Sequence, residues 1–214
     1  MTPYYQDDLV TIYHSDCRDG TGLWPLDGTM VTDPPFGIDY ESGHDGVLSR
    51  SIIGDSDVSL RDHVLAEWNS RALVFGSWRA SRPKGTRMLL VWDAMGALGM
   101  GDLALPWKPS HQEIYVIGTG FVGRRTSDVL TFPPTQATAR RGRSHPHEKP
   151  VGLMRELIQK CPSGPAIFDP FMGSGTTLVA AKSLGRKSIG IEIEERYCEI
   201  AANRCRQEVL GLTA

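Results

Sequence analysis

The stretch VTDPPFGI, residues 31–38, places an acidic residue, two prolines and an aromatic ring directly after an apolar run. The Asp33 carboxylate can accept N–H groups, and Phe36 offers a flat face for stacking. Pro34 and Pro35 have fixed φ angles and no N–H of their own, so they stiffen the turn and aim the carbonyl of Pro34. Such groups would hold and orient a planar amine. The alternative is an ordinary proline-rich turn that ends a strand.

A second stretch, AIFDPFMGSGTT at residues 166–177, has the composition of a nucleotide-binding turn. The sequence predicts a strand that ends at Asp169, then a glycine-rich turn, then a helix that begins at the threonine pair. Gly173 and Gly175 allow a tight turn and the close approach of a ligand, and the start of the helix presents free N–H groups. The alternative, an ordinary tight turn, explains less of this order of elements.

The next predicted strand ends in IGIE, which places Glu192 at its carboxyl end, 19 residues after Gly173. In dinucleotide-binding folds an acidic residue at this spacing hydrogen-bonds the ribose hydroxyls. The GSGTT stretch contains no lysine, so it is not a Walker-type phosphate loop. A ligand with an adenosine group and no triphosphate fits this pattern better.

Short apolar runs and helical periodicity predict the elements that must position these residues. Seven runs are predicted strands: 9–13, 28–32, 72–75, 88–92, 113–117, 166–168 and 188–191. Four segments have helical periodicity: 59–69, 150–160, 176–185 and 194–210. The alternation of strand and helix in the last third predicts a parallel sheet covered by helices. Two long connections, 37–59 and 118–149, are expected to be functional or disordered.

Length and composition favour one α/β domain spanning residues 1–214, because 214 residues with 40% hydrophobic content can bury one substantial core. No segment is apolar enough to span a membrane, and the N-terminus lacks the pattern of a secretion signal, so we expect a cytoplasmic protein. The four cysteines form no C-x-x-C pair, which favours reduced thiols and gives no indication of a metal site.

Charge is distributed unevenly along the chain, although the net charge is only −2. Residues 1–62 contain 3 basic and 12 acidic residues, whereas residues 63–149 contain 12 basic and 6 acidic residues. The densest basic cluster contains Arg140, Arg141 and Arg143 among Pro, Gly and Ser. This segment could follow the phosphates of a nucleic acid, or it could be an ordinary solvated loop.

Taken together, DPPF and FDPFMGSGTT resemble the amino-methyltransferases of DNA in their permuted, β-class arrangement. Further segments resemble other motifs of that family: IYHSDC, ALVFGS, MLLVWD, HQEIYVIG and HEKPVGLMRELI. The catalytic motif precedes the cofactor loop by 136 residues, from Asp33 to Asp169, as in the β order. The resemblance implies a Rossmann-like S-adenosylmethionine-dependent methyltransferase fold. Its features would be a mostly parallel seven-stranded sheet, helices on both faces and a circularly permuted motif order.

The resemblance also implies a reaction, in which a methyl group moves from S-adenosylmethionine to the exocyclic N6 of an adenine flipped out of duplex DNA. Asp33 and the Pro34 carbonyl would accept the two amine hydrogens, and Phe36 would stack on the base. Relatives that methylate cytosine N4 usually have Ser at the first position of this motif, so Asp33 favours adenine. The resemblance also implies an enzyme of the kind found in restriction-modification systems.

By the same resemblance, the catalytic residues are Asp33, Pro34, Pro35 and Phe36. The expected cofactor-binding residues are Asp16, Asp33, Lys149, Asp169, Phe171, Gly173, Ser174, Gly175, Thr176, Thr177 and Glu192. The expected nucleic-acid contacts are Arg124, Arg125, Arg140, Arg141 and Arg143. The catalytic half would span about 1–117, the basic loop about 118–149 and the cofactor-binding half about 150–214.

Several alternatives remain open at the level of sequence. Asp16 could be only a turn residue, Phe171 could be core, and Lys149 could approach the methionyl carboxylate of the cofactor or be one more basic loop residue. The chain could methylate cytosine N4 or RNA, or it could be a non-catalytic subunit that binds the cofactor. A homodimer is possible.

Overall fold

The structure is a computed structural model that describes residues 1–19, 22, 24–25, 27–37, 56–96, 98–135 and 148–211. Nine strands in these residues form one sheet, in the order β1-β2-β9-β8-β3-β4-β6-β5-β7. The strands are β1 (Tyr5–Gln6), β2 (Val10–His14), β3 (Thr29–Thr32), β4 (Arg71–Gly76), β5 (Thr86–Asp93), β6 (His111–Ile117), β7 (Val129–Thr131), β8 (Ile167–Asp169) and β9 (Ser188–Glu192). The helices are α1 (Ser59–Glu67), α2 (Val151–Gln159), α3 (Thr176–Ser183) and α4 (Glu195–Gly211).

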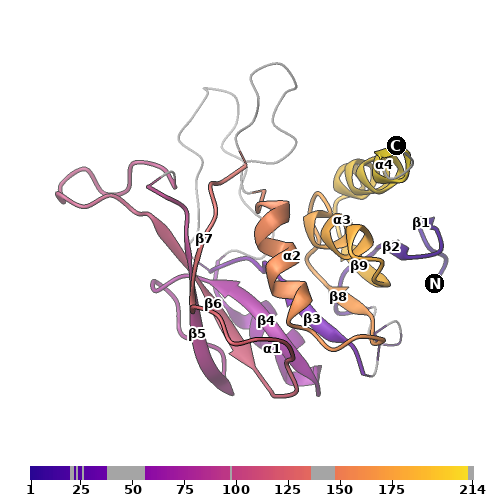
Figure 1. The fold of residues 1–214 in the computed structure, drawn as a ribbon, viewed down its shortest axis with the longest axis horizontal. Helices are drawn as coiled ribbons and strands as arrows, with labels where there is room; N and C mark the ends of the chain where they lie inside the picture. Colours follow the sequence, from indigo (N-terminus) through magenta and orange to yellow (C-terminus); the bar gives the residue numbers. More distant parts are fainter. Residues whose placement is uncertain are drawn as a thin grey trace.

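The centre of the sheet is parallel and its margins are mixed (Figure 1). Strands β2, β9, β8, β3 and β4 pair in parallel with their neighbours in that order. Strand β6 is antiparallel to both β4 and β5. Strands β8 and β9 come from the last third of the chain, yet they lie between β2 and β3 from the first third. The sheet therefore interleaves the two halves of the sequence.

All seven predicted strands are confirmed, and two short strands extend the sheet from the expected seven to nine. Strand β1 pairs with β2, and β7 pairs with β5, so the two short strands form the two edges of the sheet. Both are two or three residues long, too short for a periodic pattern in the sequence. Strand β7 lies within the segment 118–149 that was expected to be a long loop. Tertiary contacts fix it there, since the Trp92 indole N–H donates to the Phe132 carbonyl at 2.8 Å.

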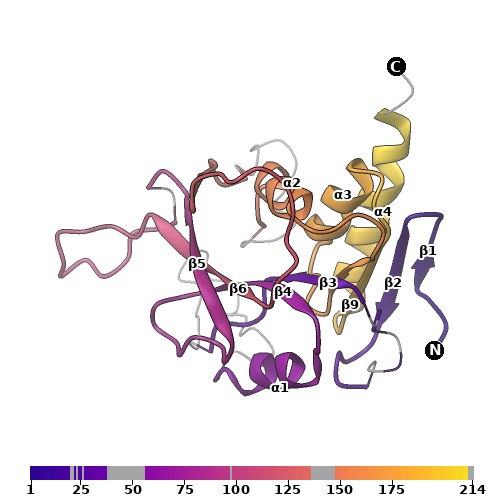
Figure 2. The same cartoon turned by 60° about the horizontal axis from the view of Figure 1, so that its bottom comes forward.

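Helices cover both faces of the sheet, as predicted. In Figure 2, α1 lies on one side and α2, α3 and α4 lie on the other. Strand β4 shows why, because its side chains alternate between the faces. Ala72 and Val74 pack in the cluster that includes Val64 of α1. Leu73 and Phe75 pack in the cluster that includes the buried residues of α2.

The four cysteines are all buried, and they form no disulfide with one another. Burial raises the pKa of Cys161 and of Cys198 to about 12, since a thiolate is poorly solvated in these surroundings. Within the described ranges, no group of three or more His, Cys, Asp or Glu could hold a metal ion. Among the same residues, no helix has the length and apolar character needed to cross a membrane.

Helix α2 forms because its apolar residues fall on one face. The buried side chains are Leu153, Met154, Leu157 and Ile158, a spacing that repeats every three to four residues. Pro150 directly precedes the helix in an extended conformation, with φ −62° and ψ 130°. This face packs on β3, β4 and β6, so α2 holds the Lys149 segment against the sheet.

Leu157→Ala should lower the free energy of unfolding by about 2–5 kcal/mol, because it leaves a cavity under α2 where Leu157 is only 2% exposed. Urea denaturation would measure the change. Arg155→Ala on the exposed side of the same helix is the matched control, with an expected effect within about 0.5 kcal/mol. Equal effects of the two substitutions would contradict the packing described for α2.

Candidate active site at the carboxyl ends of the central strands

Four acidic residues follow or end four neighbouring parallel strands. In sheet order they are Asp16 after β2, Glu192 of β9, Asp169 of β8 and Asp33 after β3. Parallel strands present their carboxyl ends at one edge, and neighbouring strands are about 4.8 Å apart. The four strand ends therefore form a row roughly 15 Å long. In open α/β folds, ligands bind at the carboxyl ends of the parallel strands, which is where this row lies.

Asp169 is the most buried member of the row. Its carboxylate accepts hydrogen bonds from the hydroxyls of Thr32 and Thr177, both at 2.6 Å, and from the Phe171 N–H at 3.1 Å. Burial raises the pKa of Asp169 to about 6, against the effect of these three donors. Thr32 directly precedes Asp33, and Thr177 lies in the first turn of α3. Asp169 thus connects the DPPF turn to the start of the helix after the glycine loop.

The two glycines of the loop are needed for different reasons. Gly173 has φ 50° and Gly175 has φ 81°, both in the left-handed region. A Cβ on Gly173 would meet no atom within 4 Å, so space is open beside this residue. A Cβ on Gly175 would lie 2.6 Å from the Cβ of Ala201 in α4. Gly175 therefore permits close packing of the loop on α4, whereas Gly173 borders open space.

Glu192 is hydrogen-bonded to the glycine loop at the carboxyl ends of the strands. Its carboxylate accepts the Gly173 N–H at 3.0 Å and the Glu194 N–H at 2.8 Å. Burial raises the pKa of the Glu192 carboxyl above its usual value. A carboxylate has about four acceptor positions, and these backbone donors use two of them. Glu192 therefore has capacity for further hydrogen-bond donors, and its binding of ribose hydroxyls stays a prediction.

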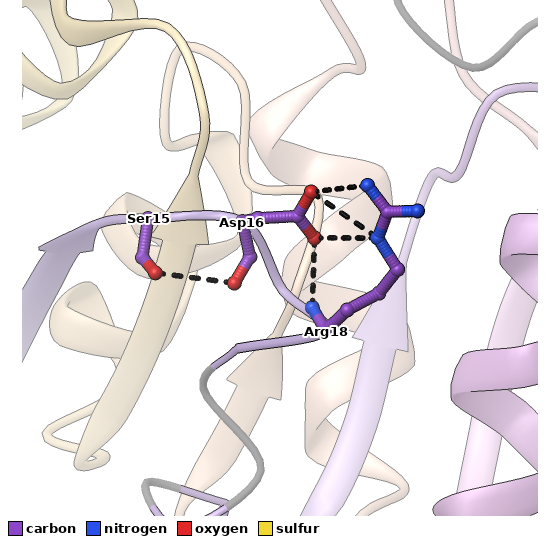
Figure 3. A network of polar contacts seen from close by, with 3 residues as sticks. All are labelled: Ser15, Asp16 and Arg18. Atoms are coloured by element: carbon purple, nitrogen blue, oxygen red, sulfur yellow. Dashed lines mark hydrogen bonds and ion pairs between the residues drawn. The ribbon is translucent and has the colours of Figure 1, made fainter.

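Asp16 lies just beyond β2, and its carboxylate is paired with Arg18 (Figure 3). The Arg18 Nη2 lies 2.6 Å from Oδ2 of Asp16, and the Arg18 Nε lies 3.0 Å from Oδ1. These hydrogen bonds hold the pKa of Asp16 below its usual value. An open cleft of about 350 Å³ borders Arg18 and the first turn of α1, where it is lined by Ser59, Leu60 and His63.

Lys149 enters the site from the HEKP segment and pairs with Asp33. It is only 6% exposed, so it is not simply one more basic residue of a surface loop. Its ammonium lies 5.0 Å from the ring centre of Phe75 and 5.7 Å from that of Phe36, close enough for cation–π attraction. The ion pair uses Oδ2 of Asp33. The other oxygen, Oδ1, is buried and has no hydrogen-bond partner among the described residues.

The remaining predicted residues differ in how far they are buried. Ser174, Thr176 and Thr177 are buried, so their hydroxyls face the protein rather than solvent. Phe171 is partly buried and packs against the cluster on the α1 face. Arg124 and Arg125 are exposed between β6 and β7, where Lys160 donates to the Arg124 carbonyl at 2.7 Å. Arg140, Arg141 and Arg143 lie outside the described residues.

Arg204 of α4 is a site residue that the sequence interpretation missed. Its Nη1 donates to the Ser174 carbonyl at 2.8 Å, to the Ser174 hydroxyl at 3.0 Å and to the Thr176 hydroxyl at 3.2 Å. Its Nη2 donates to Glu148 at 2.7 Å. The only signal in the sequence is position, since Arg204 stands three residues after Ala201 and beside the buried face of α4.

The sheet order and the row of acidic residues at the strand ends are those of a Rossmann-like fold. Solved methyltransferase structures have a similar fold, and two of them serve as examples. The M1.HpyAVI–SAM complex has a TM-score of 0.63 and 20% identity, covering 92% of this chain and 100% of that chain. The cytosine-N4-specific PvuII DNA methyltransferase has a TM-score of 0.65 and 14% identity, covering 97% of this chain and 92% of that chain.

Residues 78–203 match the DNA methylase family N6_N4_Mtase. The putative methylase YubD of Escherichia coli (strain K12) is 52% identical over 187 residues, which cover 78% of this chain and 77% of YubD. The chain therefore belongs to the N6/N4 DNA methylase family, whose members depend on S-adenosylmethionine. The type II methyltransferase M.ScaI of Streptomyces caespitosus is 40% identical over 96 residues, 42% of this chain and 32% of M.ScaI. The chain spans about a third of the length of the type II relatives it matches.

Asp169→Asn should change the pH dependence of stability. The pKa of Asp169 is about 6 in the folded chain against an ordinary value of 3.8, so ionisation of Asp169 lowers stability as pH rises from about 4 to 6. The difference corresponds to about 3 kcal/mol. The neutral variant should therefore gain on the wild type by up to that amount between pH 4 and 7 in urea denaturation. A difference independent of pH would contradict the buried, proton-binding environment of Asp169.

Gly175→Ala should destabilise the fold by about 3 kcal/mol, because the new methyl group meets α4 and the residue keeps a left-handed backbone. Gly173→Ala is the control, since it keeps the backbone cost of about 1–2 kcal/mol without the collision. Thermal and urea unfolding of the two variants would measure the difference. If Gly173→Ala were the more destabilised, the open space beside Gly173 would be refuted.

Proposed function

We propose that this chain transfers a methyl group from S-adenosylmethionine to the exocyclic N6 of an adenine flipped out of duplex DNA. The observation that carries the proposal is the state of Asp33. One carboxylate oxygen is paired with Lys149, and the other is a buried acceptor without a donor among the described residues. An amine presented to this turn would supply the missing N–H. Family membership supports DNA as the substrate.

The residues at the sheet edge fit the cofactor of the family. We infer that the ligand approaches the backbone at Gly173, where space is open, and that Glu192 binds its ribose hydroxyls with the remaining acceptor positions. Asp16 and Phe171 would lie near the adenine, with the cleft beside Arg18 adding room. Asp169 acts indirectly by fixing the loop. When bound, S-adenosylmethionine supplies an electrophilic methyl group on a sulfonium.

The DPPF turn would prepare the target nitrogen for attack. An exocyclic amine is a poor nucleophile because its lone pair is delocalised into the ring. Oδ1 of Asp33 accepts one amine hydrogen and the Pro34 carbonyl accepts the other, which directs the lone pair out of the ring plane. Phe36 stacks on the base, and the two prolines keep the acceptors in place. As positive charge develops on the nitrogen, the Asp33 carboxylate stabilises it.

Lys149 offsets the negative charge of Asp33 while it keeps the carboxylate oriented. Because its ammonium lies between the Phe75 and Phe36 rings and the carboxylate, it fixes one oxygen and leaves the other for the substrate. We propose that this pair is retained when the base binds. The exposed Arg124 and Arg125 would contact DNA phosphates outside the site.

Adenine is preferred to cytosine on the identity of Asp33, where cytosine-N4 relatives usually have Ser. The PvuII enzyme shares the fold and is cytosine-N4-specific, so the argument for adenine rests on the residue and not on the architecture. The test is incubation of the purified chain with S-adenosylmethionine and, separately, duplex DNA, single-stranded DNA or RNA. Mass spectrometry of the digested nucleosides identifies the product.

N6-methyldeoxyadenosine from duplex DNA is the expected product. N4-methyldeoxycytidine or a methylated ribonucleoside would overturn the substrate assignment and leave the methyltransferase assignment in place. No product from any of the nucleic acids would favour a subunit that binds the cofactor for another chain.

Asp33→Ala should lower the rate of methyl transfer by at least about 100-fold, because the amine loses its charged acceptor. Binding of S-adenosylmethionine, measured by calorimetry, should change much less. Asp8→Ala is the control, since Asp8 is an exposed carboxylate in the turn between β1 and β2, at the amino end of β2 rather than at the carboxyl ends of the central strands. Retained turnover in Asp33→Ala would contradict the proposed role of Asp33 as the acceptor of the amine hydrogen.

A further inference from the structure

Arg204 contacts two segments that are far apart in the sequence. One nitrogen of its guanidinium binds the glycine loop at Ser174 and Thr176, and the other binds Glu148. The side chains of Arg204 and Glu148 are 20% and 15% exposed, so the ion pair is largely shielded from water. A guanidinium has five donors in a rigid fork, which suits simultaneous contact with two partners.

The contact with Glu148 leads directly to the proposed catalytic residue. Glu148 is followed by Lys149, and Lys149 is paired with Asp33. Pro150 comes next and restricts the backbone between this pair and α2. The Glu148–Lys149 dipeptide is therefore held at one end by Arg204 and bonded to Asp33 by the next side chain. A continuous set of contacts runs from the glycine loop through Arg204 and this dipeptide to Asp33.

We propose that Arg204 is a positioning residue that couples the glycine loop to Asp33. By holding Glu148 against the loop, it places Lys149 so that one oxygen of Asp33 is fixed and the other faces the substrate amine. Occupation of the glycine loop by the methyl donor then stabilises the arrangement of the catalytic carboxylate. The inference rests on the proposed function, since it assigns Asp33 to the amine and the glycine loop to the cofactor.

A purely structural role for Arg204 predicts a different effect of its substitution. In that case its hydrogen bonds only stabilise the packing of α4 on the loop, and a variant loses stability without losing rate at temperatures where it is folded. A positioning role affects the rate in the folded protein, because a displacement of about 1 Å at a reacting group can cost on the order of 100-fold. Lysine cannot replace arginine in such a role, since one ammonium cannot reach both partners in the same geometry.

The first experiment compares Arg204→Lys and Glu148→Gln with the wild type, using Arg206→Lys as the matched control. Arg206 lies on the same helix, is exposed, and contacts Asn203 and the Tyr5 ring. Steady-state methyl transfer is measured over a range of DNA concentrations, well below the melting temperature of each variant. We expect kcat to fall about 10- to 100-fold in both site variants with little change in KM for DNA, and no change in the control.

The double variant provides a second kinetic criterion. If Arg204 acts through Glu148, Arg204→Lys combined with Glu148→Gln should be about as slow as the slower single variant, because the same contact is lost in each. Multiplied losses, or unchanged kcat in folded Arg204→Lys, would overturn the inference. Both results concern the variants and leave wild-type transfer intact, so they separate this inference from the proposed function, which fails if the wild type forms no N6-methyldeoxyadenosine from duplex DNA.

A readout independent of turnover completes the test. Hydrogen–deuterium exchange of peptides that cover residues 29–37 and 170–177 is measured with and without S-adenosylmethionine. In the wild type, cofactor should slow exchange in both peptides. In Arg204→Lys it should slow exchange in the glycine-loop peptide only, because the contact that transmits the effect to Asp33 is lost. Equal slowing of both peptides in the variant would contradict the coupling.

Discussion

The buried Asp169 carboxylate is the interaction on which the geometry of the site depends. It ends β8, accepts a hydroxyl from the residue before the DPPF turn and another from the first turn of α3, and accepts the Phe171 N–H of the loop. Burial of a carboxylate is unfavourable without such donors. The three donors come from three segments, so the arrangement forms only when the DPPF segment and the glycine loop are both in place.

This dependence explains how a permuted order of motifs still builds one site. Strand β8 lies beside β3, so the DPPF turn and the glycine loop emerge from neighbouring strands although 136 residues separate Asp33 from Asp169. Parallel pairing brings the carboxyl ends to one edge whatever the order of the strands along the chain. The order of the strands in the sheet, and not the order of the motifs along the chain, therefore determines that the DPPF turn lies beside the glycine loop.

Much of the fold followed from the sequence because its signals are local. The central strands are buried on both faces, so they read as apolar runs, and α2 has a clear apolar face. Strands β1 and β7 could not be predicted, because their few residues are fixed by neighbours distant in sequence. The predicted position of Glu192 at the carboxyl end of its strand is confirmed, whereas its hydrogen bond with the Gly173 N–H was not foreseen. The partners of Lys149 and Arg204 depend on which loops meet in space, so neither ion pair had a signal of its own.

The four buried cysteines have a consequence for how the chain can be handled and observed. Cys17, Cys161, Cys198 and Cys205 are distributed over the end of β2, the end of α2 and the inner face of α4. Reagents that attack thiolates cannot reach them in the folded state, and the raised pKa of Cys161 and Cys198 suppresses the reactive form as well. The rate at which each cysteine is labelled therefore measures how often the surrounding part of the fold opens, and no cysteine has to be introduced. These natural reporters, at three places in the fold, would reveal whether the sheet opens as one unit or in parts.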